Sequence, residues 1–281
     1  MLDVVVRLRG DFTPFSDTPS HIRVARGGSG ANLALALRAC AHRVGYVAAV
    51  GRDAAGRIFE EALRDADVAT HLYSSDRPTG TVVSLVEPDG QRSMLSDRGA
   101  NSTLDAAHVD AVLDLPFDHV HVSGYLLFDP SLRAIGTRAL ERAIERGVTS
   151  SVDVCSVGPL IRTTPRVFFE AAGSATTLLA NEAEATALTA CADAELALEA
   201  LAERFAEVVV TRGAKGADGA RGEQRFHADA RALKVLDTTG AGDAAAGAYL
   251  GARLNGAAPL VALESAMVAA ARVVGGLGPL G

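Results

Sequence analysis

The chain has 281 residues, a mass of 28.9 kDa, 48% hydrophobic residues and 22% charged residues, which is the composition of one soluble globular domain. It excludes a fibrous or disordered chain. The formal net charge is −7, and the chain has no run of lysine or arginine, which argues against a nucleic-acid partner. No charge-free stretch reaches the roughly 18 apolar residues that a membrane span requires.

Short, Val-rich runs bounded by turn residues predict strands that are buried on both faces. Helix-length segments with charge on one side lie between them, which predicts a mostly parallel sheet with helices on both faces. The predicted strands are 44–50, 119–122, 148–152, 177–180 and 208–211, and the predicted helices include 31–40, 54–64, 131–146 and 194–205.

Two segments, 2–26 and 69–96, break this alternation. In the second, apolar runs at 81–87 and 92–96 flank the turn Pro88-Asp89-Gly90, which is hairpin chemistry. We therefore expect one domain, 1–281, with inserted segments of about 4–26 and 69–97 that form a small β-sheet lid. The alternative is an antiparallel extension of the main sheet.

The run Gly27-Gly28-Ser29-Gly30-Ala31-Asn32 places a glycine turn before the helix predicted at 31–40. Glycines allow a polyhydroxy ligand to approach the backbone, and an asparagine amide can donate to and accept from vicinal hydroxyls. A tight turn with Asn32 on a solvated helix face explains the same residues equally well.

Polar residues follow two of the predicted strands at their carboxyl ends, where ligands collect in open α/β sheets. After 177–180 comes Asn181-Glu182-Ala183-Glu184, where Glu184 can reach a hydrated Mg²⁺ or can simply favour a first helical turn. After 208–211 comes Arg212-Gly213-Ala214-Lys215-Gly216, a turn that suits nucleotide phosphates or an ordinary hairpin.

The most informative segment is an apolar run, 233–236, followed by Asp237-Thr238-Thr239-Gly240-Ala241-Gly242-Asp243 and a long helical pattern. A strand, a glycine turn and a helix N-terminus together make an anion site. Glycines let the backbone N–H groups approach the anion, and the helix dipole adds partial positive charge. The segment therefore suits a phosphoryl group.

Asp243 lies beside the N–H groups that would hold this anion, and its carboxylate repels a bound phosphate. The arrangement is explained if Asp243 is a general base for a hydroxyl that attacks the phosphoryl group. The alternative is an aspartate that caps its own helix. The chain contains no Walker loop, and the loose dinucleotide fingerprint beginning at Gly240 lacks a following strand.

In order and spacing these turns resemble the ribokinase-like, or PfkB, family of carbohydrate kinases over essentially the full chain. The first and last matching segments are the two signatures of that family. The six segments are Gly27-Gly28-x-x-x-Asn32, Gly51-x-Asp53-x-x-Gly56, Gly99-Ala100-Asn101, Asn181-x-x-Glu184, Thr211-x-Gly213-x-Lys215-Gly216 and Asp237-Thr238-x-Gly240-Ala241-Gly242-Asp243.

The resemblance implies a three-layer α/β/α sandwich with a mostly parallel central sheet and a small β lid that closes over a sugar. It also implies Mg²⁺-dependent transfer of the γ-phosphoryl group of ATP to a hydroxymethyl oxygen. On the family pattern, Asp243 is the catalytic base, and the N–H groups from Gly240 through Ala241 and Gly242 to Asp243 form the anion hole.

The family pattern also assigns binding roles. The expected sugar ligands are Asp3, Gly28, Asn32 and Asp243. The expected nucleotide and metal residues are Asn181, Glu184 (Mg²⁺ through water), Thr211, Gly213, Gly216 and Asp237 (near a K⁺ or other monovalent-cation site).

The chain departs from the family pattern in two places. It begins two residues before Asp3, where members have a complete strand ending in Gly-x-x-x-x-Asp. Because half a central strand leaves ladder groups unpaired, we expect the native start codon to lie upstream. Second, the segment 122–125 contains no acid where ribose-specific members carry a sugar-binding Glu, which disfavours ribose as the substrate.

The leading hypothesis is an ATP-dependent kinase of a small sugar, with nucleosides and 2-keto-3-deoxy sugar acids as alternatives. A non-catalytic ligand sensor is the competing class, but a sensor does not need the carboxylate of Asp243 beside a phosphate. The three cysteines, Cys40, Cys155 and Cys191, form no Cys-x-x-Cys pair, which favours a reducing, cytoplasmic compartment. An exposed lid edge makes a homodimer an expected assembly.

Overall fold

The computed structural model describes residues 1–88, 92–231 and 239–277. Its largest sheet has six strands in the order β12-β11-β10-β9-β8-β7, of which β7 to β10 are parallel and β11 and β12 are antiparallel. The strands predicted at 119–122, 148–152, 177–180 and 208–211 all lie in this sheet. The strands are β7 (His119–Ser123), β8 (Thr149–Asp153), β9 (Thr177–Asn181), β10 (Glu207–Thr211), β11 (Ala217–Arg221) and β12 (Gln224–Ala228).

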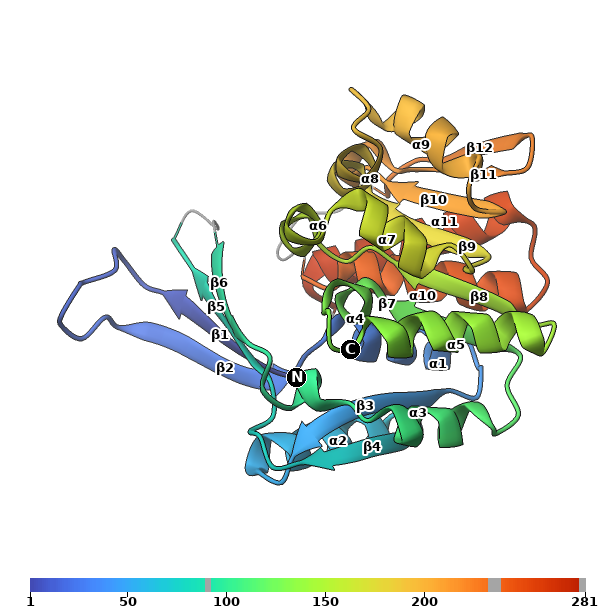
Figure 1. The fold of residues 1–281 in the computed structure, drawn as a ribbon. Helices are drawn as coiled ribbons and strands as arrows, with labels where there is room; N and C mark the ends of the chain where they lie inside the picture. Colours follow the sequence, from blue (N-terminus) through green and yellow to red (C-terminus); the bar gives the residue numbers. More distant parts are fainter. Residues whose placement is uncertain (89–91, 232–238, 278–281) are drawn as a thin grey trace.

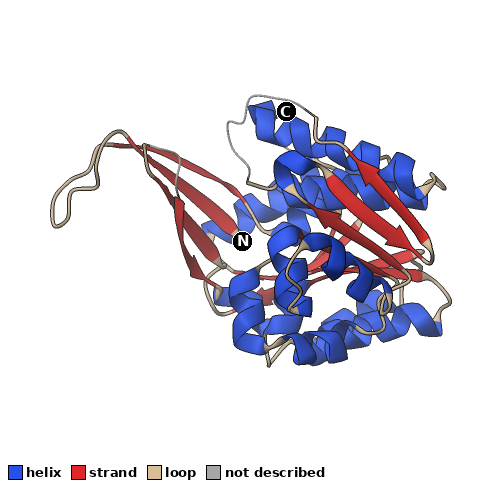
Figure 2. Ribbon diagram, turned by 90° about the horizontal axis from the view of Figure 1, so that it is seen from above, coloured by secondary structure: helices blue, strands red, loops and turns tan. Residues whose placement is uncertain are grey.

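Helices cover both faces of this sheet (Figure 2). Leu178 and Val208 point into one core and Leu179 and Val209 into the other, because successive side chains of a strand face opposite sides. On the first face lie α3 (Ala106–Leu113), α4 (Gly124–Phe128), α5 (Arg133–Glu145), α6 (Val157–Thr163), α7 (Pro165–Ala172), α8 (Glu182–Thr189) and α9 (Ala194–Ala202). On the second lie α1 (Ser29–Ala39), α10 (Ala241–Leu254) and α11 (Pro259–Arg272).

Strands β3 (Gly45–Gly51) and β4 (Ala69–Ser75) form a separate parallel pair. They are joined by α2 (Ala54–Asp65), whose Phe59 and Leu63 are fully buried. The expectation that the whole of 69–97 belongs to the lid is therefore wrong for β4. Its parallel pairing with β3 through a crossover helix makes it part of the α/β body.

The lid is a sheet of its own in the order β2-β1-β5-β6, and it projects from one side of the body (Figure 1). The alternative of an extension of the main sheet is thus wrong. Strand β1 is antiparallel to β2 and parallel to β5, and β5 and β6 are antiparallel. The strands are β1 (Leu2–Leu8), β2 (Ser20–Arg26), β5 (Thr81–Val86) and β6 (Arg92–Asp97).

Two chain segments that connect the lid to the body pack closely against each other. Gly99, the first residue of η1 (Gly99–Thr103), has a φ of +44°, and a Cβ there would collide with the carbonyl oxygen of Pro78. Ala100 donates its N–H to the same oxygen at 2.7 Å, and Leu2 donates to Gly80 O at 2.8 Å. The lid therefore enters and leaves the body through hydrogen-bonded backbone.

Helix α10 is fixed to its neighbours at two points. Gly247 lies so close to α1 that a Cβ there would collide with Ala36. The hydroxyl of the buried Tyr249 donates to Glu207 at the start of β10, at 2.6 Å, and Arg253 also pairs with this carboxylate. These contacts set the position of the α10 N-terminus relative to β10 and α1.

Among the described helices, α11 with most of η3 (Val273–Leu277) is long and apolar enough to cross a membrane by length and composition alone. Its inner side packs into the core beside α10, and core helices meet the same criteria. The buried side chains on that side include Ala262, Leu263, Ala266 and Met267. The strand predicted at 233–236 lies outside the described residues.

Candidate active site

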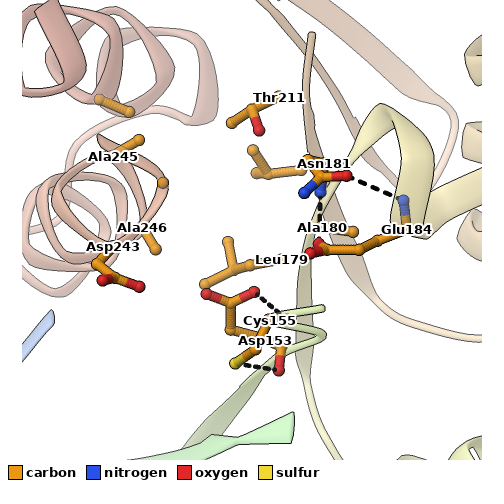
Figure 3. Close-up of a pocket in the computed structure, with 13 residues that line it drawn as sticks. Asp153, Cys155, Leu179, Ala180, Asn181, Glu184, Thr211, Asp243, Ala245 and Ala246 are labelled. Atoms are coloured by element: carbon orange, nitrogen blue, oxygen red, sulfur yellow. Dashed lines mark hydrogen bonds between the residues drawn. The ribbon is translucent and has the colours of Figure 1, made fainter. Parts of the chain in front are cut away.

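A pocket lies between the carboxyl ends of the parallel strands and the N-terminal half of α10 (Figure 3). Its position agrees with the rule that ligands bind at the carboxyl edge of open α/β sheets. The lining residues are Asp153, Cys155, Leu179, Ala180, Asn181, Glu184, Val209, Thr211, Gly242, Asp243, Ala245, Ala246 and Ala266.

The carboxylate of Asp243 is held by the start of α1. Ser29 Oγ donates to Asp243 Oδ1 at 2.6 Å, and Asn32 Nδ2 donates to Oδ2 at 2.8 Å. Arg26 Nη1 donates to Asn32 Oδ1 at 2.5 Å, which fixes the amide so that its NH₂ faces the acid. Asn32 therefore binds Asp243 and does not lie on a solvated face. Neither Ser29 nor Arg26 stands out in the sequence as a site residue.

The turn before α10 has the geometry of an anion site. Gly240 is the N-cap with a φ of +77°, a conformation that favours glycine, and it makes no side-chain capping bond. As the first N–H groups of the helix, those of Ala241, Gly242 and Asp243 have no partner within α10. Ser29 and Asn32 of α1 bind the Asp243 carboxylate, and no side chain caps α10, so the alternative that Asp243 caps its own helix is wrong.

Asp153, at the end of β8, is a site residue that the sequence analysis missed. Its side chain lies in the pocket and the residue is only 9% exposed. Burial, then the negative charges of Glu184 and Asp243, raise the pKa of Asp153 well above its usual range. An acid directly after the predicted strand 148–152 is the signal that could have identified it.

Cys155 follows with a φ of +69°, a strained value for a residue other than glycine. Its Sγ lies 3.3 Å from Ser123 Oγ and 3.8 Å from Ser29 Oγ. Burial, then the charge of Asp153, raise the pKa of the Cys155 thiol well above its usual range. The side chain therefore stays a neutral thiol at physiological pH.

Asn181 and Glu184 form a capping box at the start of α8. Glu184 donates its N–H to Asn181 Oδ1 at 2.9 Å, and Asn181 donates its N–H to Glu184 Oε2 at 2.9 Å. Glu184 is 3% exposed, and burial raises its pKa. The predicted helix-start role is thus present, and the same two residues line the pocket.

Of the nucleotide residues predicted around the turn after β10, one lines the pocket and two do not. Thr211 lines the pocket. Gly213 begins η2 (Gly213–Lys215), and Arg212 donates its N–H to Gly216 O at 2.7 Å, so the backbone forms the hairpin between β10 and β11. At Gly216, with a φ of +86°, a Cβ would collide with the carbonyl oxygen of Ala228. Gly213 and Gly216 are outside the pocket lining.

Asp3 and Gly28 lie where the lid meets the body. The carboxylate of Asp3 packs directly against Gly27, where a Cβ would collide with it. Burial raises the pKa of Asp3 despite the nearby charge of Arg26. Gly28 has a φ of +97°, which places the start of α1 beside β1. These predicted sugar ligands are outside the pocket lining and lie on its lid side.

The acids and the amide of the pocket are the candidate metal ligands. The described ranges contain no group of three His, Cys, Asp or Glu residues arranged to bind one. Asp153, Glu184 and Asn181 do supply oxygen atoms, the donors that Mg²⁺ prefers, and Mg²⁺ commonly takes one or two carboxylates together with substrate phosphates. The donor set fits Mg²⁺ shared with a nucleotide. Asp237, the predicted monovalent-cation residue, lies outside the described residues.

Comparison with known proteins decides the family, because residues 3–280 match the model of the pfkB family carbohydrate kinase. The chain belongs to the PfkB family of carbohydrate kinases. The predicted family, the fold class and the assignment as a kinase are therefore confirmed.

Several relatives of this PfkB kinase have names that describe a substrate. It is 32% identical to an ATP-dependent ribose-1-phosphate kinase of Halopiger xanaduensis, over 96% of this chain and 88% of that protein. It is 29% identical to a 2-dehydro-3-deoxygluconokinase of Thermoproteus tenax, over 88% and 79% of the two chains. A crystal structure of adenosine kinase from Sinorhizobium meliloti is similar with a TM-score of 0.87 and 26% identity, over 100% and 93% of the chains.

Proposed function

We propose that this PfkB kinase transfers the γ-phosphoryl group of ATP to a hydroxymethyl oxygen of a small sugar, with Asp243 as the general base. The observation that carries the proposal is the carboxylate of Asp243, held on both oxygens by α1 beside the first N–H groups of α10. A base and an anion hole thus adjoin one another, as in-line phosphoryl transfer requires.

In the proposed reaction, Asp243 accepts the proton of the sugar hydroxyl while the sugar oxygen forms a bond to the γ-phosphorus. The bond between that phosphorus and the bridging oxygen breaks, and ADP leaves. The N–H groups of Gly242 and Asp243 bind the oxygens on which negative charge accumulates. Mg²⁺, when bound, neutralises phosphate charge, and Asn181 and Glu184 would hold it, Glu184 through water.

The remaining binding roles follow the family pattern. Asp3, Gly28 and Asn32 would hold sugar hydroxyls on the lid side of the pocket. Thr211 and the turn at Gly213 and Gly216 would adjoin the nucleotide. The support is positional, since Asn32 is bonded to Asp243 and Thr211 lines the same pocket as Asp243. The K⁺ site at Asp237 stays a prediction.

An anionic sugar is the second candidate substrate, because the Halopiger and Thermoproteus relatives are named for a sugar phosphate and a sugar acid. Arg98 supports it. Its guanidinium lies 3.4 Å from the carbonyl oxygen of Tyr125 and 3.5 Å from the carboxylate of Asp129, and its Nε has no hydrogen-bond partner among the described residues. An anionic substrate would compete with Asp129 for this guanidinium.

The test is ADP release from ATP and Mg²⁺ with a panel of ribose, fructose, ribose 1-phosphate, adenosine and 2-keto-3-deoxygluconate. Turnover with one group identifies the substrate class. Asp243→Asn is the control variant and should bind nucleotide normally while turnover falls by about 10²–10⁴-fold. If every acceptor fails while nucleotide binds, the sensor hypothesis is favoured.

We also propose a cytoplasmic enzyme that forms a homodimer and has no nucleic-acid or membrane partner. The charge of −7 supports the absence of nucleic acid. The lid supports the dimer, because β2 and β6 are edge strands and carry exposed Ile22, Val24 and Leu95. Sedimentation velocity of the wild type and Ile22→Thr tests this, and a monomer in both samples contradicts it.

A further inference from the structure

Arg26, the last residue of the lid strand β2, is a charged side chain with no substrate contact in the proposed reaction. It is partly buried, and burial lowers the pKa of its guanidinium. An arginine presents a fork of N–H donors. Of these, only Nη1 has a hydrogen-bond partner among the described residues, the Oδ1 atom of Asn32 at 2.5 Å. Most of the hydrogen-bonding capacity of this partly desolvated cation is therefore open to a ligand.

Two acids lie near Arg26, but neither pairs with it. Asp3 and Asp243 stabilise the guanidinium through space, whereas no hydrogen bond or ion pair joins it to a carboxylate within the described ranges. Removing a charge from water is unfavourable unless the charge is paired. The end of β2 thus brings an incompletely paired guanidinium to the body, and guanidinium groups bind carboxylates and phosphates through two parallel hydrogen bonds.

Arg26 lies on the side of Asp243 where the acceptor sugar would bind. Its partner Asn32 donates to Oδ2 of Asp243, so one amide group separates the guanidinium from the proposed base. Asp3, Asn32 and Asp243 are partly exposed, like Arg26 itself, as is expected of residues that a ligand can reach. An acceptor whose hydroxyl reaches Asp243 can therefore contact Arg26 with another of its oxygens.

We infer that Arg26 binds an anionic group of the acceptor, a carboxylate or a phosphate, and so makes this kinase selective for acidic sugars. This inference rests on the proposed function and names its substrate class. Without a cation here, the carboxylates of Asp3 and Asp243 would repel such an acceptor. A neutral sugar can accept a hydrogen bond from the guanidinium but cannot pair its charge.

Arg98 is the alternative ligand for such an anion. It follows β6, which lies at the opposite edge of the lid sheet from β2, and it pairs with Asp129 at 3.5 Å. An anion that binds Arg98 must compete with this carboxylate, whereas an anion that binds Arg26 displaces no paired acid. The described contacts therefore favour Arg26 over Arg98.

The experiment measures acceptor binding by calorimetric titration in Mg²⁺ and a non-hydrolysable ATP analogue, so that the acceptor binds without reacting. The probes are ribose 1-phosphate, 2-keto-3-deoxygluconate and neutral ribose. Arg26→Gln removes the charge but keeps an amide that can donate to Asn32. The matched control Arg23→Gln removes one exposed charge of the same strand. Arg26→Gln should raise Kd about 10–100-fold for the preferred anionic probe and less than about threefold for ribose, and Arg23→Gln should change neither.

A loss confined to the anionic probes identifies an anion ligand, and the two probes distinguish a phosphate from a carboxylate. Equal weakening of ribose and the anionic probes would show that Arg26 only holds Asn32, and it overturns the inference. The inference is also overturned if the wild type binds neither anionic probe more tightly than ribose, or if Arg98→Gln causes the loss instead. If an anionic probe binds through Arg26 but releases no ADP from ATP, the inference holds and the proposed function fails.

Arg26→Lys separates the charge from the planar fork. It keeps the positive charge, so its affinity for the anionic probe should lie between those of the wild type and Arg26→Gln. Thermal unfolding checks that each variant is folded. If Arg26→Gln does not fold, Arg26→Lys replaces it, and an equal loss of affinity for ribose and the anionic probes would again contradict the inference.

Discussion

The lid sheet and the six-stranded sheet each contain a Val-rich strand, β1 and β10, but are buried to different extents. In the six-stranded sheet, Leu178 and Val208 are fully buried. In the lid, Ile22 is 66% exposed and Leu95 is 63% exposed. The lid is therefore held mainly by its strand ladders and its backbone connection to the body, which is the situation expected of an element that closes on a ligand.

The same division runs through the site. The body supplies Asp243 and the first N–H groups of α10, which are the proposed base and anion hole, and the acids at the strand ends. The lid supplies Asp3 and carries the chain into the turn before α1. We expect changes in the body to alter the rate of the chemical step and the free energy of unfolding, and changes in the lid to alter substrate affinity.

The largest expected difference is in kcat, between the variants Asp243→Asn in the body and Asp3→Asn in the lid. Asp243→Asn should lower kcat by about 10²–10⁴-fold, because it removes the proposed proton acceptor. Asp3→Asn should raise KM for the sugar about tenfold and change kcat little, because it weakens a ground-state hydrogen bond. Steady-state kinetics measures both, and an equal loss of kcat in the two variants would contradict the division.

Truncation of one leucine in each region tests the difference in burial. Leu140→Ala removes a fully buried side chain of α5 and should lower the free energy of unfolding by about 2–5 kcal/mol. Leu95→Ala removes a side chain that is 63% exposed on β6 and should change it by less than about 0.5 kcal/mol. Urea unfolding compares the variants, and similar losses would mean that the lid face is covered in solution.

Acid sensitivity should come from two histidines of β7 in the body. Burial lowers the pKa of His119 to about 4 and of His121 to about 3, and both rings bond to Ser151. In the unfolded chain these rings are protonated near pH 6.5. Above that pH both states hold neutral rings, so the protein keeps its full stability with respect to these histidines. As pH falls from 6.5 towards 4, each histidine should cost about 1.4 kcal/mol per pH unit.

The variant His121→Asn tests this sensitivity, because asparagine can keep a hydrogen bond to Ser151 but does not titrate. Between pH 8 and pH 5 it should lose about 2 kcal/mol less stability than the wild type. Urea unfolding at the two pH values gives both numbers. Parallel losses in the two proteins would show that other groups govern acid unfolding.

The strands of the six-stranded sheet were predictable because a strand buried on both faces needs a continuous apolar run, and 177–180 and 208–211 consist of such runs. Strand β4 was assigned to the wrong sheet because its sequence is half polar and resembles that of the lid strands. β4 pairs with β3 because the crossover helix α2 places the two strands side by side. The residues of β4 alone do not indicate this pairing.

The site was predictable where chemistry is concentrated in a short segment, as in the turn that ends at Asp243. It was not predictable where side chains from distant segments meet. Asp153 stands outside every motif, and Ser29 was indistinguishable from a turn residue until α1 packed against α10. Gly213 and Gly216 had two interpretations, and their positive φ values come from the hairpin that the backbone forms.

The hydrogen bond between Ser29 and Asp243 joins residues 214 positions apart. On a ribosome that adds about 5–20 residues per second, α1 emerges roughly 10–40 s before the helix that completes its contacts. During that interval Leu33 and Leu37, which α10 helps to bury, are available to chaperones. A chain terminated before α10 lacks both Asp243 and the first N–H groups of that helix, so under the proposed mechanism incomplete translation products would not consume ATP.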